Sequence, residues 1–179
     1  MQTRGHTLAN GQVLIIREAV EDDAAHALAF AEATAHESDF LSFGPGEFGH
    51  TEAQERAFIR ACAGSPNRLF IIGLIDDALV SLLHFTPGDR PRQRHTGELG
   101  LSVRRPYWGM GIASLMLETL VGWAQQGGVV TKINLRVRHD HARAIAIYER
   151  QGFVTEGTIT RAVRVGGRYY DHVWMGLEL

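Results

Sequence analysis

The chain has 179 residues, which is enough for one well-packed domain and too few for two comfortable ones. A hydrophobic share of 45% and a formal net charge of −2 exclude a nucleic-acid binder that works by broad charge neutralisation. Cys62 is the only cysteine, so neither an intramolecular disulfide nor a cysteine-rich zinc site can form.

We expect no targeting signal at the beginning of the chain. Residues 1–12 lack the apolar core of a signal peptide, and no run in the sequence approaches the ~20 apolar residues that span a membrane. We therefore expect a cytoplasmic protein without a membrane partner. We also expect a single domain over residues 1–179, with residues 1–12 as a flexible tail.

The next stretch of the sequence predicts one strand and two helices. Residues 13–19 are typical of a strand, and residues 21–38 predict a helix with acidic residues in its first turn. A loop rich in glycine and aromatic residues follows over residues 39–50, and we expect it to shape a pocket. The second helix is predicted over residues 51–63, with Thr51 as its N-cap.

The middle of the chain predicts a hairpin and then a strand that leads into a long helix. Residues 69–75 and 78–85 are β-rich runs separated by two aspartates, which favours a tight antiparallel turn. A basic loop separates this hairpin from a strand over residues 98–103. The helix over residues 112–126 carries apolar residues on most of its circumference, so it should be central and buried.

The last part predicts one more strand and helix, followed by a terminal hairpin. Residues 129–137 form the strand, and Asp140 is positioned to cap a helix over residues 141–152. Residues 153–165 and 168–179 are joined by two glycines, which is typical of a type I′ hairpin. The whole order predicts a mixed α/β layer with one strand–helix–strand unit at its centre.

Two glycines, Gly109 and Gly111, stand where the central strand gives way to the long helix. The start of a helix exposes backbone N–H groups without helical partners, and the peptide dipoles add about half a positive charge there. Glycines ahead of the helix remove the side chains that would keep a phosphate away. The segment therefore has the properties of a phosphate-binding turn.

Three kinds of phosphate ligand could bind at such a turn. A mononucleotide loop needs GxxxxGK followed by Ser or Thr, and no such run exists. A dinucleotide fingerprint needs GxGxxG, but Ser114 replaces the third glycine, and Thr131 stands where an acidic residue should hold a ribose. The third ligand is the pyrophosphate of coenzyme A, and the wider sequence favours it.

Two segments carry a resemblance to a known family: LGLSVRRPYWGMGIASLMLETLVGWA and INLRVRHDHARAIAIYERQGFVTEG. They resemble the GCN5-related N-acetyltransferase (GNAT) superfamily, in particular its bacterial branch acting on protein N-termini, polyamines and small amines. The family loop Q/RxxGxG/A is matched at Gly111 and Ala113, with Trp108 at its first position. The family segment NxRAIxLYEKxGF is matched up to Phe153, with His141 at the asparagine position. The likeness extends over about Val13 to Leu179.

The resemblance implies a GNAT-like α/β fold with a mixed, mostly antiparallel sheet, about four helices and a splayed central parallel strand pair. It implies an acetyl-CoA-dependent N-acetyltransferase that moves the acetyl group directly to a primary amine in a ternary complex. The implied cofactor-binding residues are Leu101, Ser102, Val103, Trp108, Gly109, Met110, Gly111, Ile112, Ala113, Ser114, His141 and Tyr148. In the family, pantetheine lies beside the strand backbone like an added strand.

Acetyl transfer needs a base for the amine and an acid for the leaving thiolate. The resemblance gives Tyr148 the role of the acid, since a phenol has a pKa of about 10 and a thiol about 8.5. Glu98, at the start of the central strand, resembles the family's base. His95, His84 or a water chain stay open for the same role.

The acceptor is expected to be an amine, either a small molecule or a protein N-terminus, with no nucleic-acid partner. Acidic residues could attract a cationic amine, and aromatic residues could form walls, although acidic residues on helices are usually only solvated. The acidic set is Glu32, Glu37, Asp39 and Asp171, and the aromatic set is Phe43, Phe48, Tyr170 and Trp174. A homodimer and an acyl group longer than acetyl stay open.

No metal is expected, because the His139 to His141 run has no cysteine nearby and no third ligand in register. Two other functions stay open at this point. One is a non-catalytic acyl-CoA-binding regulatory module on the same fold, which the replaced motif positions Trp108 and His141 favour. The other is a dinucleotide-dependent enzyme.

Overall fold

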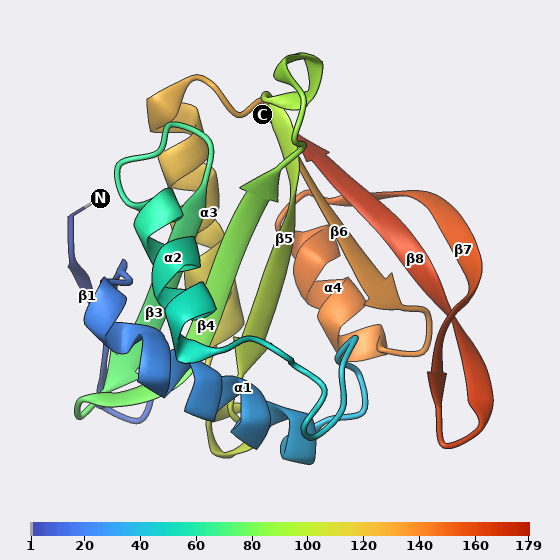
Figure 1. Ribbon diagram of the computed structural model, residues 1–179, viewed down its shortest axis with the longest axis horizontal. Coiled ribbons are helices and arrows are strands. Elements are labelled where there is room, and N and C mark those ends of the chain that lie inside the picture. Colours follow the sequence, from blue (N-terminus) through green and yellow to red (C-terminus); the bar gives the residue numbers. More distant parts are fainter. Residues whose placement is uncertain (1) are drawn as a thin grey trace.

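The computed structural model describes residues 2–179 as one sheet of strands with helices on both faces (Figure 1). The strands are β1 (Arg4–Thr7), β2 (Val13–Glu18), β3 (Leu69–Ile75), β4 (Ala78–Pro87), β5 (Thr96–Val103), β6 (Lys132–Arg138), β7 (Val154–Val165) and β8 (Arg168–Glu178). The α-helices are α1 (Ala24–Glu37), α2 (Glu52–Cys62), α3 (Ile112–Gly127) and α4 (Ala142–Arg150). Short 3-10 turns cover η1 (Glu21–Asp23), η2 (Pro91–Gln93) and η3 (Arg105–Tyr107).

The strands lie in the order β1-β2-β3-β4-β5-β6-β8-β7. Every neighbouring pair is antiparallel except β5 and β6, which run parallel on either side of α3 in the sequence. A parallel pair needs a crossover connection, and α3 supplies it. This arrangement confirms the predicted mixed, mostly antiparallel sheet with four helices.

The parallel pair opens like a fork. Pairing between β5 and β6 covers only Thr96 to Glu98, although β5 continues to Val103. Asn134 stands at the vertex and donates its side-chain amide to Thr96 Oγ1 at 2.8 Å and to the carbonyl of Gly97 at 3.2 Å. Beyond this point the strands separate towards the bottom of the view in Figure 1. The expected splayed pair is therefore present.

Each face of the sheet has its own core. The larger core packs α3 and the apolar face of α4 against the sheet, with Phe85, Met116 and Leu120 fully buried. The smaller core packs α1 and α2 on the opposite face, around Ile59 and Phe70. Alternation along β4 and β5 explains the division, because successive side chains of a strand point to opposite faces.

Residues 4–7 differ from the expected flexible tail. They form β1, which pairs with β2 in the register Arg4↔Ile16 to Thr7↔Val13. The four residues contain no β-branched apolar residue and only one β-branched residue of any kind, so their own sequence signal is weak. The apolar edge of β2 supplies the pairing partner, which local sequence cannot reveal.

The helix starts follow the predicted signals at α2 but not at α1 or α4. The acidic residues predicted for the first turn of α1 form the 3-10 turn η1, and α1 begins at Ala24 without an acidic first turn. Thr51 caps α2, accepting the N–H of Gln54 at 3.3 Å while the Gln54 side chain accepts the N–H of Thr51 at 2.8 Å. Asp140, in contrast, does not cap α4, whose N-cap is His141 without a side-chain hydrogen bond. Among the helices of residues 2–179, none has the length and apolar character to cross a membrane.

Candidate active site

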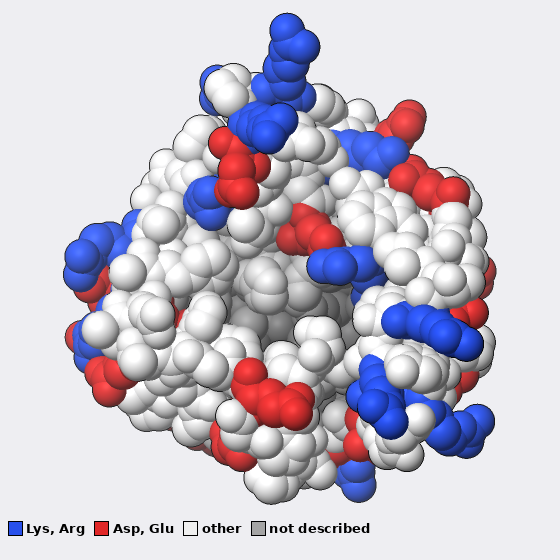
Figure 2. Space-filling model, turned by 45° about the vertical axis from the view of Figure 1, so that its right-hand side comes forward, with Lys and Arg blue, Asp and Glu red and all other residues white. Residues whose placement is uncertain are grey.

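A cavity of about 960 Å³ opens where β5 and β6 separate. Its walls come from β4, β5 and β6, from the first turn of α3, from one face of α4, and from α1 with the loop that follows it. Figure 2 shows the hollow, with uncharged side chains over most of its surface and charged ones around its edge. Its size lies at the upper end of the range typical of ligand sites.

The free edge of β5 presents backbone groups to this cavity. At the end of the strand, the N–H of Arg104 donates to the carbonyl of Val80 at 2.9 Å. Because hydrogen bonding alternates along an antiparallel pair, the N–H and C=O of Leu101 then point away from β4, into the gap. The backbone groups of Ser102 point the other way, towards β4, and its carbonyl accepts a hydrogen bond from the Ser81 hydroxyl at 2.9 Å.

The glycine turn leaves the start of α3 uncapped. Gly109 and Gly111 have φ angles of 87° and 81°, a region that side-chain-bearing residues rarely adopt. Gly111 is the N-cap, no side chain bonds to the helix start, and the first turn contains no acidic residue. Both glycines line the cavity together with the first turn of α3, whereas Met110 packs against the larger core.

Trp108 occupies the position where the family has a polar side chain. Its indole N–H donates to the carbonyl of Val103 at 2.7 Å, which ties the turn to the end of β5. Trp108 is 42% exposed, and the guanidinium groups of Arg105 and Arg143 lie 5.6 and 5.9 Å from the centre of its ring. Trp108 thus lines the cavity without adding a charge of its own.

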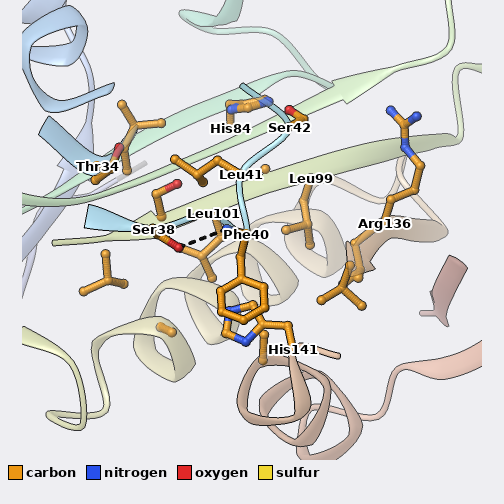
Figure 3. Close-up of a pocket in the computed structure, with 18 of the residues that line it drawn as sticks. Thr34, Ser38, Phe40, Leu41, Ser42, His84, Leu99, Leu101, Arg136 and His141 are labelled. Atoms are coloured by element: carbon orange, nitrogen blue, oxygen red, sulfur yellow. Dashed lines mark hydrogen bonds between the residues drawn. The ribbon is translucent and has the colours of Figure 1, made fainter. Parts of the chain in front are cut away.

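Helix α4 contributes Tyr148 and, at its N-cap, His141. Tyr148 packs edge-on to Phe153 at 5.8 Å, and its hydroxyl has no hydrogen-bond partner within residues 2–179. Burial raises the pKa of Tyr148 to about 12. The His141 ring stacks on Phe40 at 3.8 Å (Figure 3), and burial, followed by the charge of Arg138, lowers its pKa.

The candidate bases differ in whether they line the cavity. Glu98 lines it, and one carboxylate oxygen accepts the Arg136 guanidinium Nε–H at 2.6 Å. His84 also lines it, with its ring directly against Gly100, where an added Cβ would lie 2.3 Å from the ring. Burial, and secondarily His50, lowers the pKa of His84 to about 4. His95 is not part of the lining.

Comparison with known proteins agrees with this geometry. The model of the Acetyltransferase (GNAT) family matches residues 19–153. The chain belongs to the GNAT family of acetyltransferases.

Three relatives show how far the likeness goes. An acetyltransferase of the GNAT family from Streptococcus pneumoniae has a TM-score of 0.90 at 30% identity, covering 93% of this chain and 99% of that one. The L-amino acid N-acetyltransferase AaaT of Escherichia coli is 29% identical over 63% of this chain and 70% of its own length. The structure of yncA from Salmonella typhimurium, a putative acetyltransferase solved with its cofactor acetyl-CoA, has a TM-score of 0.81 at 17% identity, covering 93% and 94%.

Two of the acidic residues considered for the acceptor, Glu37 and Glu32, already have partners in this GNAT acetyltransferase. Burial by itself would raise the pKa of Glu37, but Arg104 at 2.9 Å and the N–H of Arg105 at 2.7 Å lower it overall. The carboxylate of Glu32 accepts the N–H of Gly46 at 3.0 Å.

The remaining residues of the acidic and aromatic sets differ in whether they line the cavity. Asp171 accepts the N–H of Arg161 at 2.8 Å, and neither Asp171 nor Asp39 lines the cavity. Of the aromatic residues, Phe43 and Phe48 line the cavity, whereas Tyr170 and Trp174 do not.

Arg138 has a structural role that sequence patterns do not indicate. This side chain is only 6% exposed and pairs with both carboxylate oxygens of Asp140, at 2.8 and 2.7 Å. It also donates to the carbonyl of Asp39 at 2.7 Å and lies over the rings of Phe40 and Tyr170. Arg138 therefore fastens the loop after α1 to the sheet, and it explains why Asp140 is not the helix cap.

The structure gives no metal-binding cluster in the part that it describes. Across residues 2–179, no group of three or more histidine, cysteine, aspartate or glutamate side chains could hold a metal ion. Asp140 of the His139 to His141 run is paired with Arg138, and His141 stacks on Phe40.

Proposed function

We propose that the chain moves an acetyl group from acetyl-CoA to a primary amine by direct transfer within a ternary complex. The observation that carries the proposal is one continuous cavity, which joins the uncapped start of α3, the free edge of β5 and the unpartnered hydroxyl of Tyr148. Acetyl-CoA in the Salmonella structure and the amino-acid acceptor named for the E. coli relative support it.

The residues present fit a coenzyme A molecule. The first-turn amides of α3, from Ile112 to Ser114, have no side-chain cap and suit a pyrophosphate. Arg143 lines the cavity beside Gly109 and makes no ion pair within the described residues, so its charge is available for a phosphate. The N–H and C=O of Leu101 can bond the amides of pantetheine like a neighbouring strand.

Acetyl-CoA supplies a thioester whose carbonyl carbon bonds to the amine nitrogen while the carbon–sulfur bond breaks. Tyr148 meets this step protonated, because its pKa of about 12 lies far above neutral pH. A phenol of that pKa is a weaker acid than a thiol, so its role is to donate a hydrogen bond to the sulfur as negative charge develops. Burial strengthens that bond because few water molecules compete for it.

The amine must lose a proton, and Glu98 is the residue proposed to receive it. Only one of its two carboxylate oxygens bonds to Arg136, so the other remains free to accept a proton directly or through water. Arg136 also fixes the direction of the carboxylate. The proton that leaves the amine passes from Glu98 to solvent, and the departing thiolate takes up a proton from solvent and leaves as the free thiol of coenzyme A.

A panel of amines tests this function, with amino acids and peptide N-termini included and release of free thiol from acetyl-CoA as the readout. Tyr148→Phe keeps the ring and removes the hydroxyl, so turnover should fall by about 10²-fold or more while coenzyme A still binds. Thiol release from no acceptor, with coenzyme A bound, would instead favour a non-catalytic acyl-CoA-binding module. Binding of NAD in place of coenzyme A would contradict both.

A further inference from the structure

The cavity has a second end, away from the α3 turn, whose walls are aromatic. We call it the acceptor chamber. It lies between α1, its following loop, α2 and strand β4, and its phenylalanines are Phe40, Phe43, Phe48, Phe58 and Phe70. Phe43 and Phe48 lie 5.0 Å apart, and Phe58 meets Phe70 edge-on at 5.6 Å. Such walls favour an apolar ligand, because each ring offers a large apolar surface to it.

Every carboxylate on the wall already has a partner. Within residues 2–179 the lining contains Glu37, Glu55 and Glu98 and no aspartate. Glu37 is held by Arg104 at 2.9 Å, and Glu98 by Arg136 at 2.6 Å.

The third carboxylate is the most deeply buried. The Glu55 side chain is 3% exposed and lies 2.9 Å from the ring of His50. The free oxygen of Glu98 serves the reacting amine, so a second ammonium group on the ligand would find no further unpaired carboxylate, and burial of an unpaired charge costs several kcal/mol.

Two of the histidines that line the cavity, His84 and His172, have pKa values below the usual value for histidine. His84 lies between Phe58 at 6.0 Å and Gly100, and neither ring nitrogen has a hydrogen-bond partner in the described chain. With its pKa lowered to about 4 by burial, the ring is neutral. His172, on the opposite wall, also has a lowered pKa, caused by burial and then by Arg136.

The loop after α1 forms the roof of the chamber and is fixed in place. Figure 3 shows it running from the stack of Phe40 on His141 towards Ser42, at the end of the view where His84 lies. Arg138 anchors the loop at the first of these points. The apolar walls are therefore present before any ligand binds.

We propose that the acceptor is a primary amine on an apolar, preferably aromatic, body that carries no second positive charge, and that diamines and polyamines are poor acceptors. This inference rests on the N-acetyl transfer proposed above. It narrows the acceptor from amines in general to the class that aromatic walls, and carboxylates already bonded to protein partners, accommodate.

Two matched pairs of amines test it, with thiol release from acetyl-CoA by the intact chain as the readout. The pairs are 2-phenylethylamine with 1,4-diaminobutane, and L-phenylalanine with L-lysine. We expect kcat/KM to favour the phenyl member by about tenfold to a hundredfold, from burial of the ring. Equal or better turnover of the diamine or of lysine overturns the inference and leaves the acetyltransferase function standing.

Absence of turnover with all four amines would count against the proposed function, and binding then decides the inference separately. Calorimetry with the coenzyme A complex should show tighter binding of 2-phenylethylamine than of 1,4-diaminobutane. Equal binding of the two, or tighter binding of the diamine, would overturn the acceptor class.

A negative charge introduced into the loop after α1 provides a second test of the acceptor class. Ser42 lines the chamber, is exposed, and has no role in the proposed chemistry. Ser42→Glu should raise kcat/KM for 1,4-diaminobutane relative to 2-phenylethylamine by about tenfold over Ser42→Gln, which has the same shape without the charge. Acetyl-CoA affinity should be equal in the two variants. The same amine preference in both variants would overturn the role of the missing carboxylate.

Discussion

The two ends of the cavity use charge in opposite ways. At the α3 end, a helix start without a cap faces the cavity, and Arg143 makes no ion pair within the described residues. At the acceptor chamber, each wall carboxylate has a protein partner, and several phenylalanines line the walls. One end is prepared for a polyanion, and the other is prepared for a ligand with little charge.

The two ends are also built differently along the chain. The α3 end comes mainly from one continuous strand–turn–helix segment, so local sequence determines it. The acceptor chamber brings together α1, α2, β4, β5 and β6, which lie far apart in the sequence. Changes at the α3 end should therefore alter acetyl-CoA affinity alone, and changes at the chamber should alter acceptor kinetics and stability.

The largest difference should appear in the pH dependence of stability, because His84 is buried as a neutral ring. Its pKa is about 4 in the folded chain and about 6.5 when unfolded, so the unfolded state binds more protons between these values. Stability present above pH 6.5 should fall by up to about 3 kcal/mol as the pH drops to 4. His84→Phe removes this group, and denaturant unfolding at both pH values checks the effect. An equal pH dependence in wild type and variant would contradict it.

A methyl group at Gly100 should disturb the chamber next. The added Cβ of Gly100→Ala lies 2.3 Å from the His84 ring, and overpacking of this kind costs about 1–3 kcal/mol. We expect a lower melting temperature and a raised KM for the acceptor, with acetyl-CoA affinity unchanged. Gly157→Ala is the matched control, because nothing lies within 4 Å of its Cβ. Similar losses in both variants would show that space beside His84 is not the cause.

Loss of one cation should weaken the α3 end. Arg143→Gln removes a charge-assisted contact to a phosphate, so the Kd of acetyl-CoA should rise about tenfold. The difference from wild type should shrink at high salt, while the KM of the acceptor stays constant. Arg161→Gln removes an exposed arginine from β7, outside the cavity, and serves as the control. A Kd unchanged by Arg143→Gln would remove this residue from the phosphate site.

The smallest expected effect concerns the helix cap. Gly111 has a φ angle of 81°, so Gly111→Ala should cost about 1 kcal/mol in backbone strain. Its methyl group would also enter open space on the cavity wall, and acetyl-CoA affinity should fall several-fold. Gly122→Ala lies in the same helix with nothing within 4 Å of its Cβ and should stabilise the chain slightly. Calorimetric binding and thermal unfolding of both variants distinguish the two effects.

Most of the fold is predictable from the sequence because the relevant signals are local. Strand alternation, the capping pair of Thr51 with Gln54, and the glycine turn each lie within a few neighbouring residues. The strand β1 was missed, since its pairing partner and not its own composition makes it a strand.

Only part of the candidate site is predictable from the sequence, for the same reason. The cofactor-binding and catalytic assignments stay predictions, and the structure brings most of those residues, including Glu98 and Tyr148, to one cavity. The pairing of Glu98 with Arg136 and the anchoring of the roof loop by Arg138 could not be foreseen. Each joins side chains that are distant in sequence, and a single sequence carries no signal for such pairs.

The fork between β5 and β6 has a consequence for the cost of ligand entry. Asn134 bonds to Gly97 and Thr96 at the vertex, and beyond Glu98 the two strands share no pairing that a ligand would have to break. A peptide-like chain can enter the sheet without first unzipping it. The backbone groups of Leu101 are already oriented towards that chain, so reorganisation of the protein costs little of the binding free energy.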